Sequence, residues 1–342
     1  MAKKNKTPLG IFTESIGLYF SNFEKFIKYM TFPVLGQVTG LLIIFSLLLF
    51  YSNNMPNLIN KFPTLANFNT LFIIGILIVL PGLILFTKSF WEYLVAYGAI
   101  NSMLENMLKS GKVYDFDAHT ELIKRRSIPF IGLWMLFGIY TLFFMIPLIS
   151  WIPCIVMGVY FVLIFQVFTY EPELSPIGCL KKSFQLINGH FASTFMLMAL
   201  VGALTYILIP EIINTFCEIA GLSNILAKFS EPLVKMLPIM ELNNFLISFK
   251  LKPISINSAS LFFVSVFIAQ IFIQYTLPLR TILWGMWYRE LNGSLPKQTE
   301  VSKTKRSTKK PSEKLMKESH KKFTSKKLDK NILKRVMEKD ED

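Results

Sequence analysis

The sequence predicts an all-α integral membrane protein, with about six transmembrane helices and two amphipathic helices on the cytoplasmic face of the membrane. The chain is 52% hydrophobic and only 17% charged, whereas soluble globular domains are about 25% charged. Apolar stretches such as 38–51 and 72–86 follow one another along the chain, and a helix of ~20 apolar residues crosses a bilayer. These stretches are continuous and do not alternate with polar residues, which argues against a membrane β-barrel.

Six apolar segments are the expected spans, and the polar segments between them set their limits. The spans cover residues 29–51, 68–87, 128–148, 151–170, 191–213 and 258–279. A very short turn near Pro147 and Pro153 predicts that spans three and four form a tight antiparallel hairpin. Aromatic residues at 88–109 and 280–290 predict helical extensions of spans two and six. The apolar content of the loop 214–257 predicts one or two helices on the surface.

These segments divide the chain into three parts. Residues 1–28 are expected to form an amphipathic interfacial helix, residues 29–291 a polytopic membrane domain, and residues 292–342 a basic cytoplasmic tail that is partly disordered. The tail holds 16 Lys and Arg residues against 8 Asp and Glu residues. Three interpretations stay open: a solvated tail that fixes topology, attraction to anionic lipid headgroups, and binding of RNA or the ribosome through phosphate contacts.

Basic residues near the spans predict the orientation, because Lys and Arg collect on the cytoplasmic side of a membrane. With both termini in the cytoplasm, the opposite loops hold few basic residues. These are Lys61, Lys228, Lys235, Lys250 and Lys252. We therefore expect a multi-pass protein of the cell (inner or plasma) membrane with both termini inside.

Residues 8–23 and 176–191 resemble each other at an offset of 168 positions, as PLGIFTESIGLYFSNF and PIGCLKKSFQLINGHF. The identical pairs are Pro8/Pro176, Gly10/Gly178, Ser15/Ser183, Leu18/Leu186 and Phe23/Phe191. An apolar stripe at helical spacing matches as well. It comprises Phe12, Ile16, Tyr19, Phe23 and Ile27 in one copy, and Leu180, Phe184, Ile187, Phe191 and Phe195 in the other. This pattern predicts a parallel duplication, with spans three and four as an inserted hairpin. The alternative is a chance likeness of two short amphipathic helices.

Three charged residues close to the spans are candidates for a binding site. Lys88 and Glu92 stand four residues apart after span two, and Arg280 follows span six. The favoured interpretation is anchoring at the membrane interface, where aromatic belts and long basic side chains are ordinary. The alternative is a polar groove open to the cytoplasm, because ionisable groups inside a bilayer are usually functional.

Catalytic and metal-binding patterns are weak, so we expect no enzymatic activity, no cofactor and no metal. The three histidines lie in different segments, and no H-E-x-x-H, G-x-S-x-G or P-loop pattern occurs. Asp115, Asp117 and His119 form a small acidic cluster. It is read as a solvated loop, with a divalent-cation site as the alternative. The three cysteines are expected to be unpaired.

Two short patterns resemble a known family. One covers the segment 151–209 and contains FTYE at 168–171, PIGCLKKS at 176–183 and LINGHF at 186–191; the other runs from Pro278 to Leu291. They are similar to the membrane domain attached to some bacterial glycerophosphoryl diester phosphodiesterases, and to related uncharacterised multi-spanning bacterial proteins. The resemblance implies a fold and a membrane role. It does not imply the activity, because the segment after residue 291 lacks the phosphodiesterase pattern.

The favoured hypothesis is a non-catalytic membrane scaffold or accessory protein that acts on lipids or on other membrane proteins. Its expected partners are membrane lipids, with anionic headgroups meeting the basic tail, and a membrane protein. One alternative is a small transporter or permease with a cytoplasm-facing groove at Lys88, Glu92 and Arg280. A second is a factor in membrane-protein biogenesis whose basic tail binds lipid or the ribosome; nucleic acid is the less favoured partner.

Overall fold

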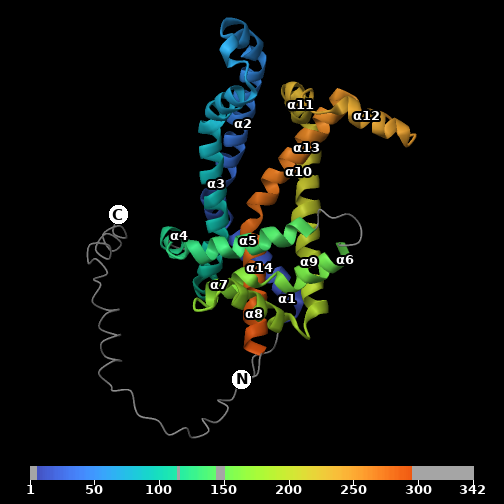
Figure 1. Ribbon diagram of the computed structural model, residues 1–342. Coiled ribbons are helices and arrows are strands. Elements are labelled where there is room, and N and C mark those ends of the chain that lie inside the picture. The colour runs from blue at the N-terminus through green and yellow to red at the C-terminus, as the bar shows by residue number, and fades with distance from the viewer. Residues whose placement is uncertain (1–5, 114–115, 144–150, 295–342) are drawn as a thin grey trace, which may run out of the picture. The chain divides into compact units, whose positions relative to one another are not determined.

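The computed structural model describes residues 6–113, 116–143 and 151–294 (Figure 1). Within these ranges the chain forms helices joined by short loops, and no β-strand is found there. The first helices are α1 (Pro8–Ser21), α2 (Phe23–Lys61), a 3-10 turn (Pro63–Leu65), α3 (Phe68–Ser110), α4 (Phe116–Lys124), α5 (Ser127–Phe143) and α6 (Trp151–Phe161). They are followed by α7 (Ile164–Tyr170), α8 (Pro176–Ile187), α9 (Phe191–Gly202), a π-helical turn (Ala203–Leu208), α10 (Ile209–Ile219), α11 (Leu222–Val234), α12 (Ile239–Ser248), α13 (Ile256–Tyr275) and α14 (Leu277–Ser294).

Five helical segments are long and apolar enough to cross a membrane, which confirms the expected class of multi-span α-helical protein. They are Phe23–Lys61, Phe68–Ser110, Trp151–Tyr170, Phe191–Ile219 and Ile256–Tyr275. Six is reached only if α4 and α5, which meet at a bend of 80°, count as one span. Part of the expected third span, residues 144–148, lies outside the described residues.

The helices α2 and α3 form a long antiparallel hairpin (Figure 1). Glycines allow its two backbones to approach closely. A Cβ atom added to Gly40 would lie 2.7 Å from the backbone nitrogen of Phe86, and one added to Gly82 would lie 2.9 Å from the carbonyl oxygen of Gly40. Helix α3 continues without a break from its apolar half into the aromatic half after Lys88, as expected.

A second group of helices joins α9, the π-helical turn and α10 to α13, with α11 packed against α13. Ala227 of α11, with Val264 and Ile268 of α13, forms a small core of its own. Helix α10 runs six residues past the expected end of span five, because its apolar pattern continues until Gly221, whose φ of 71° ends the helical path. The helices expected in the loop 214–257 are α11 and α12, and no residue of α12 is buried.

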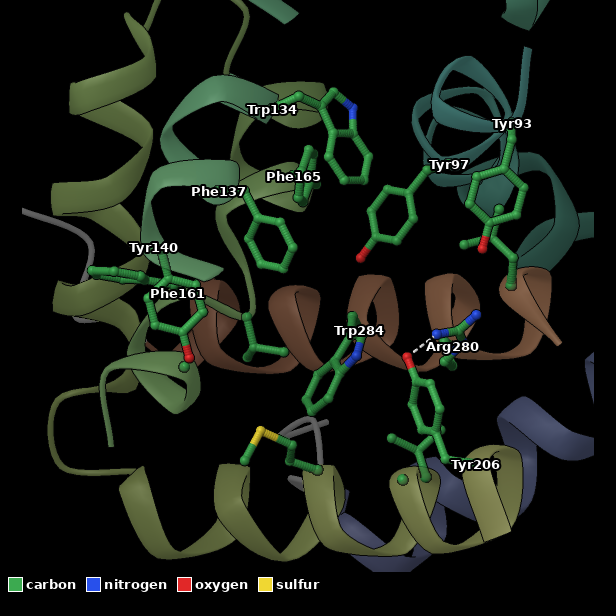
Figure 2. Close-up of a pocket in the computed structure, with 16 residues that line it drawn as sticks. Tyr93, Tyr97, Trp134, Phe137, Tyr140, Phe161, Phe165, Tyr206, Arg280 and Trp284 are labelled. Atoms are coloured by element: carbon green, nitrogen blue, oxygen red, sulfur yellow. Dashed lines mark hydrogen bonds between the residues drawn. The ribbon is translucent and has the colours of Figure 1, made fainter. Parts of the chain in front are cut away.

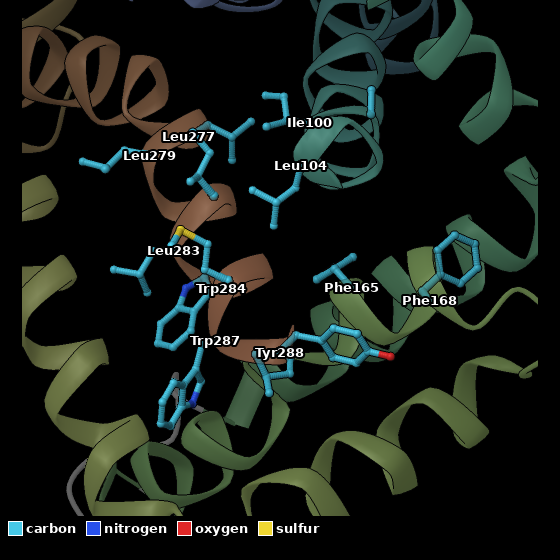
Figure 3. Close-up of a cluster of buried hydrophobic side chains, with 14 of the residues drawn as sticks. Ile100, Leu104, Phe165, Phe168, Leu277, Leu279, Leu283, Trp284, Trp287 and Tyr288 are labelled. Carbon is cyan, nitrogen blue, oxygen red and sulfur yellow. The ribbon is translucent and has the colours of Figure 1, made fainter. Parts of the chain in front are cut away.

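The main hydrophobic core lies at α14, which packs against α1, α3, α7 and α8. Figure 3 shows Leu283, Trp284 and Trp287 of α14 on the opposite side of the helix from Leu104 of α3 and Phe165 of α7. The indole Nε1 of Trp287 donates a hydrogen bond to Thr194 Oγ1 at 3.0 Å, which anchors α9 to the same core. Apolar residues of α14 are therefore buried on more than one side of the helix, while Arg280, Arg289 and Glu290 stay partly exposed.

The expected fourth span is found with the same limits, as the helical segment Trp151–Tyr170. Val162 and Leu163 interrupt its α-helical pattern between α6 and α7. In Figure 1, α5 runs across the direction of α2 and α3 and not along it. Arg126, which precedes α5, connects the start of the hairpin made by α5, α6 and α7 to its end at α7. Its guanidinium donates hydrogen bonds to the carbonyl oxygens of Phe168, at 2.9 Å, and Pro172, at 3.0 Å.

Candidate ligand-binding cavity

A cavity of about 480 Å³ lies between α3, α5, α6, α9 and α14 (Figure 2). Nine of its sixteen lining residues are aromatic. Two interruptions of regular α-helix border the cavity. Val162 lies between α6 and α7, and Gly202 and Tyr206 lie at the π-helical turn. Short π-helical segments inside α-helices occur frequently at functional sites.

Stacked and edge-on aromatic rings form one wall of the cavity. The ring of Phe165 lies 4.4 Å from that of Trp134 and 4.9 Å from that of Tyr97, measured between centroids. Figure 2 shows the hydroxyl group of Tyr97 directed toward α14 and the ring of Trp284 on the opposite side. These large side chains contact one another along the wall.

Arg280 is the charged residue of the cavity lining. Its guanidinium donates a hydrogen bond to the hydroxyl group of Tyr206 and another, of 2.9 Å, to the carbonyl oxygen of Ile273. It also lies 4.9 Å from the centroid of the Tyr206 ring. Within the described chain its Nε atom is buried without a hydrogen-bond partner, and so is Nε1 of Trp134 in the facing wall. A buried donor without an acceptor costs about 1–3 kcal/mol.

The structure gives each of the three predicted groove residues a different partner. The Lys88 ammonium lies 5.6 Å from the centroid of the Phe32 ring. Glu92 accepts a salt bridge of 2.7 Å from Lys124 of α4. Of the three, Arg280 lines the cavity, and none of the contacts between described residues joins it to Lys88 or Glu92.

A buried polar cluster lies behind the aromatic wall and was not predicted from the sequence. Gln166 and Asn101 are both fully buried, and Gln166 Nε2 lies 3.4 Å from Tyr97 Oη and 3.4 Å from Asn101 Oδ1. Tyr170 donates a 2.8 Å hydrogen bond to the carbonyl oxygen of Asn101. The available signal was an uncharged polar residue, Gln166, inside an otherwise apolar candidate span.

The two similar helices, α1 and α8, begin in the same way. Thr7 and Ser175 are the N-caps, and each side chain accepts a 3.2 Å hydrogen bond from the backbone N–H three residues later, at Gly10 and Gly178. A proline follows each cap. Such N-caps stabilise a helix by about 1 kcal/mol. Both helices then pack against α14 at one end of the second group of helices (Figure 1).

Tyr19 and Ile187 of the expected stripe are buried, but the other buried positions of the two helices lie one residue before the expected ones. Ser15 and Ser183 lie at the centre of the buried face and are fully buried, whereas Phe23 and Phe184 are about half exposed. The fully or nearly fully buried equivalent pairs are Ile11/Cys179, Ser15/Ser183 and Tyr19/Ile187. The N-terminal helix also ends earlier than expected. Asn22 separates α1 from α2, so Phe23 begins the next helix, as Phe191 does after α8.

The remaining predicted features are only partly covered by the structure. Asp115 and the tail from Leu295 onward lie outside the described residues. His119 Nδ1 lies 2.6 Å from Ser102 Oγ. No group of three potential metal ligands occurs within the described part of the chain. All three cysteines are free thiols.

No protein-family model matches the chain, and neither curated proteins nor solved structures show a significant match to it.

Proposed function

We propose that this protein is a non-catalytic membrane accessory protein that binds a lipid-like amphiphile with an anionic head. The observation that carries the proposal is the aromatic cavity of about 480 Å³ with one arginine in its wall. Ligand pockets in proteins are mostly apolar, measure about 300–1,000 Å³ and contain a few polar groups that orient the ligand.

The residues suggest how such a ligand is held. An acyl chain lies against the aromatic rings and loses its contact with water, at about 0.8 kcal/mol per buried CH₂ group. A carboxylate or phosphate head lies at Arg280, because a guanidinium binds these groups in a bidentate, charge-assisted way. The volume is that of a single-chain ligand and is small for a phospholipid with two chains.

We infer the membrane setting from the apolar surface and from the basic residues. The long helices α2, α3, α10 and α13 expose large apolar side chains along their length, which suits contact with lipid. The excess of basic residues around α1, α4 and α8 favours the cytoplasmic side for this end, in the cell membrane with both termini inside. A basic tail on the same side favours anionic lipids as further partners.

We also propose that α1–α3 and α8–α14 are two copies of one unit. Each copy starts with a capped amphipathic helix, breaks for one residue in the first copy and for three in the second, and continues into an apolar helix. The copies end in α3 and α14, whose aromatic halves pack against each other in the core. The proposed relationship to the membrane domain of glycerophosphoryl diester phosphodiesterases rests on the sequence patterns alone.

A binding experiment with two matched probes tests the ligand proposal. The purified protein in lipid nanodiscs is titrated with a fluorescent long-chain polyene fatty acid and with the corresponding neutral alcohol. We expect the acid to bind at least tenfold more tightly than the alcohol, because a hydrogen bond to a charged group contributes about 1.5–3 kcal/mol. Equal affinity for the two probes, or no saturable binding of either, contradicts the proposal.

Two pairs of variants locate the binding. A Cβ atom added at Gly202 or at Gly138 meets no atom within 4 Å, but only Gly202 lines the cavity. Gly202→Leu should therefore abolish binding of both probes, while Gly138→Leu leaves it unchanged. Arg280→Met should remove the preference for the acid, while Lys88→Met keeps it.

A further inference from the structure

The hairpin made by α5, α6 and α7 contains the segment Trp151–Tyr170, which is long enough to cross a membrane, but it does not run alongside the long helices α2 and α3. It crosses the direction of α2 and α3 in Figure 1, and α5 leaves α4 at an angle of 80°. The turn between α4 and α5 contains Arg125 and Arg126, and Lys124 precedes it. The chain thus bends sharply at a basic cluster before its next apolar helix.

The packing of the hairpin keeps it at the level of α8, a helix of twelve residues that is too short to span a bilayer. The ring of Tyr160 in α6 stacks on Phe184 of α8 at 4.4 Å, and Ser183 Oγ donates a 2.6 Å hydrogen bond to the carbonyl oxygen of Tyr160. In α5, a Cβ atom added to Gly132 would lie 3.5 Å from Pro176, at the start of α8. Helix α6 also packs on α9. Helix α9 is the first part of the apolar segment Phe191–Ile219, which follows α8 in the chain.

The two faces of α5 differ completely in burial. Phe130 and Leu133 are fully buried against the core. The opposite face carries an apolar stripe at helical spacing, with exposures of 83% at Ile128, 64% at Met135 and 59% at Leu142. Helix α6 adds further exposed apolar residues, including Ile152 and Ile155. Surfaces of this kind are covered in a native protein by a partner or by a membrane.

We propose that α5–α7 is a hairpin that lies in one leaflet, parallel to the membrane surface, and does not cross the bilayer. Its exposed stripe is covered by the acyl chains of that leaflet, and the cluster Lys124–Arg126 meets the headgroups. Helix α5 is apolar on both faces, so one face packs on the protein core and the other is available to acyl chains. Basic side chains next to such a segment are attracted to anionic headgroups. This proposal is independent of the ligand in the cavity.

Depth measurements along α5 distinguish the two arrangements. Single cysteines at the exposed positions 128, 135 and 142 are introduced into a variant whose native cysteines are replaced by alanine. Each protein is spin-labelled and reconstituted in bilayers of phosphatidylglycerol and phosphatidylethanolamine, and depth is obtained from the relative accessibility to oxygen and to a water-soluble nickel chelate. Positions 72, 76 and 83 on the exposed side of α3 are the matched controls, because α3 is long enough to cross the bilayer.

A hairpin in the plane of the membrane places all three labels on α5 at the same shallow depth, while the labels on α3 show a depth gradient. If α5 crossed the bilayer, the labels at 128 and 142, which are fourteen positions apart, would be separated by about 21 Å along the bilayer normal. A label at 135 near the bilayer centre, with 128 and 142 at opposite surfaces, would overturn the proposal. Replacement of Ile131 and Ile139 by labelled cysteine gives a second series if one of the first variants does not fold.

Discussion

Asn22 and His190 hold the same backbone conformation at equivalent joints of the chain. Their φ and ψ angles are −121° and 17° for Asn22 and −120° and 17° for His190. Asn22 ends α1 and starts α2, whereas His190 starts α9 two residues after Asn188 has ended α8. The shared conformation sets a similar turn between an interfacial helix and a span, although the two side chains differ in every respect.

The two side chains predict different effects of substitution at this joint. Asn22 is nearly fully buried; its amide nitrogen donates a 3.0 Å hydrogen bond to the carbonyl oxygen of Gly111, and its amide oxygen accepts one of 3.0 Å from the N–H of Val113. Asn22→Ala removes both and leaves buried groups unpaired, at a cost of about 1–3 kcal/mol. His190 is exposed, so His190→Ala should cost less than about 0.5 kcal/mol.

Thermal unfolding of the two variants in the same detergent measures the difference. We expect a clear fall in the midpoint for Asn22→Ala and almost none for His190→Ala. Equal midpoints would show that the hydrogen bonds of Asn22 do not tie the end of α3 to the first joint.

The class of the fold was predictable, because long apolar runs have few other stable solutions. The helical extension of α3 through Lys88 followed from the same pattern. The path of α5–α7 was not predictable, because hydropathy measures how apolar a segment is and not what covers it. Phe165 and Phe168 look like lipid-facing residues in the sequence, yet both are buried by protein.

The site was predictable only at Arg280, where a charge follows an apolar span. Trp134, Tyr97 and Tyr206 come from distant segments and carry no local signal, because aromatic residues are frequent throughout this chain. Lys88 and Glu92 have the spacing of a helical ion pair. The structure pairs Glu92 with Lys124 instead, since α4 brings a second ammonium group to the same carboxylate.

Because α2 and α3 approach each other closely, a larger side chain at Gly40 should destabilise the protein strongly. A Cβ atom there would lie 2.7–2.9 Å from backbone atoms of Phe86, which cannot move away without separating the helices. Small residues at such crossings let membrane helices pack. Gly40→Val should therefore lower the unfolding midpoint sharply, by an overpacking cost of about 1–3 kcal/mol.

Gly138→Val is the matched control, because a Cβ atom at Gly138 meets nothing within 4 Å. Both variants replace a helical glycine with the same side chain, so their intrinsic helix propensities change alike. Similar midpoints for the two variants would rule out tight backbone packing in the α2–α3 hairpin.

The thiol of Cys179 is predicted to react very slowly. It is fully buried in α8, and burial raises its pKa to about 11, whereas an ordinary cysteine has a pKa of about 8.5. At pH 8 the reactive thiolate is therefore a much smaller fraction of Cys179 than of an ordinary cysteine. Because the folded-state pKa is raised, alkylation should accelerate as the pH rises toward 11.

The rate of N-ethylmaleimide labelling in detergent tests this with a control on the same helix. Cys154 and Cys217 are replaced by alanine in both proteins, and the control carries Ile177→Cys with Cys179→Ala, because Ile177 is 59% exposed. The control should label rapidly at pH 8, and unfolding should abolish the difference. Equally rapid labelling of folded Cys179 would mean that α8 does not pack as described.

Tyr206 is predicted to compete with an anionic ligand for Arg280. Its hydroxyl group accepts a hydrogen bond from the guanidinium, and its ring lies beneath the same group at 4.9 Å. An acidic headgroup that binds Arg280 must replace the hydroxyl, so Tyr206→Phe removes the competitor and keeps the ring. We expect the affinity for the fluorescent fatty acid to rise several-fold while the affinity for the alcohol stays the same. When Arg280→Met is present, Tyr206→Phe should no longer raise the affinity for the fatty acid. Weaker binding of the acid to Tyr206→Phe would instead make the hydroxyl a direct ligand of the headgroup, with Arg280 as the residue that positions it.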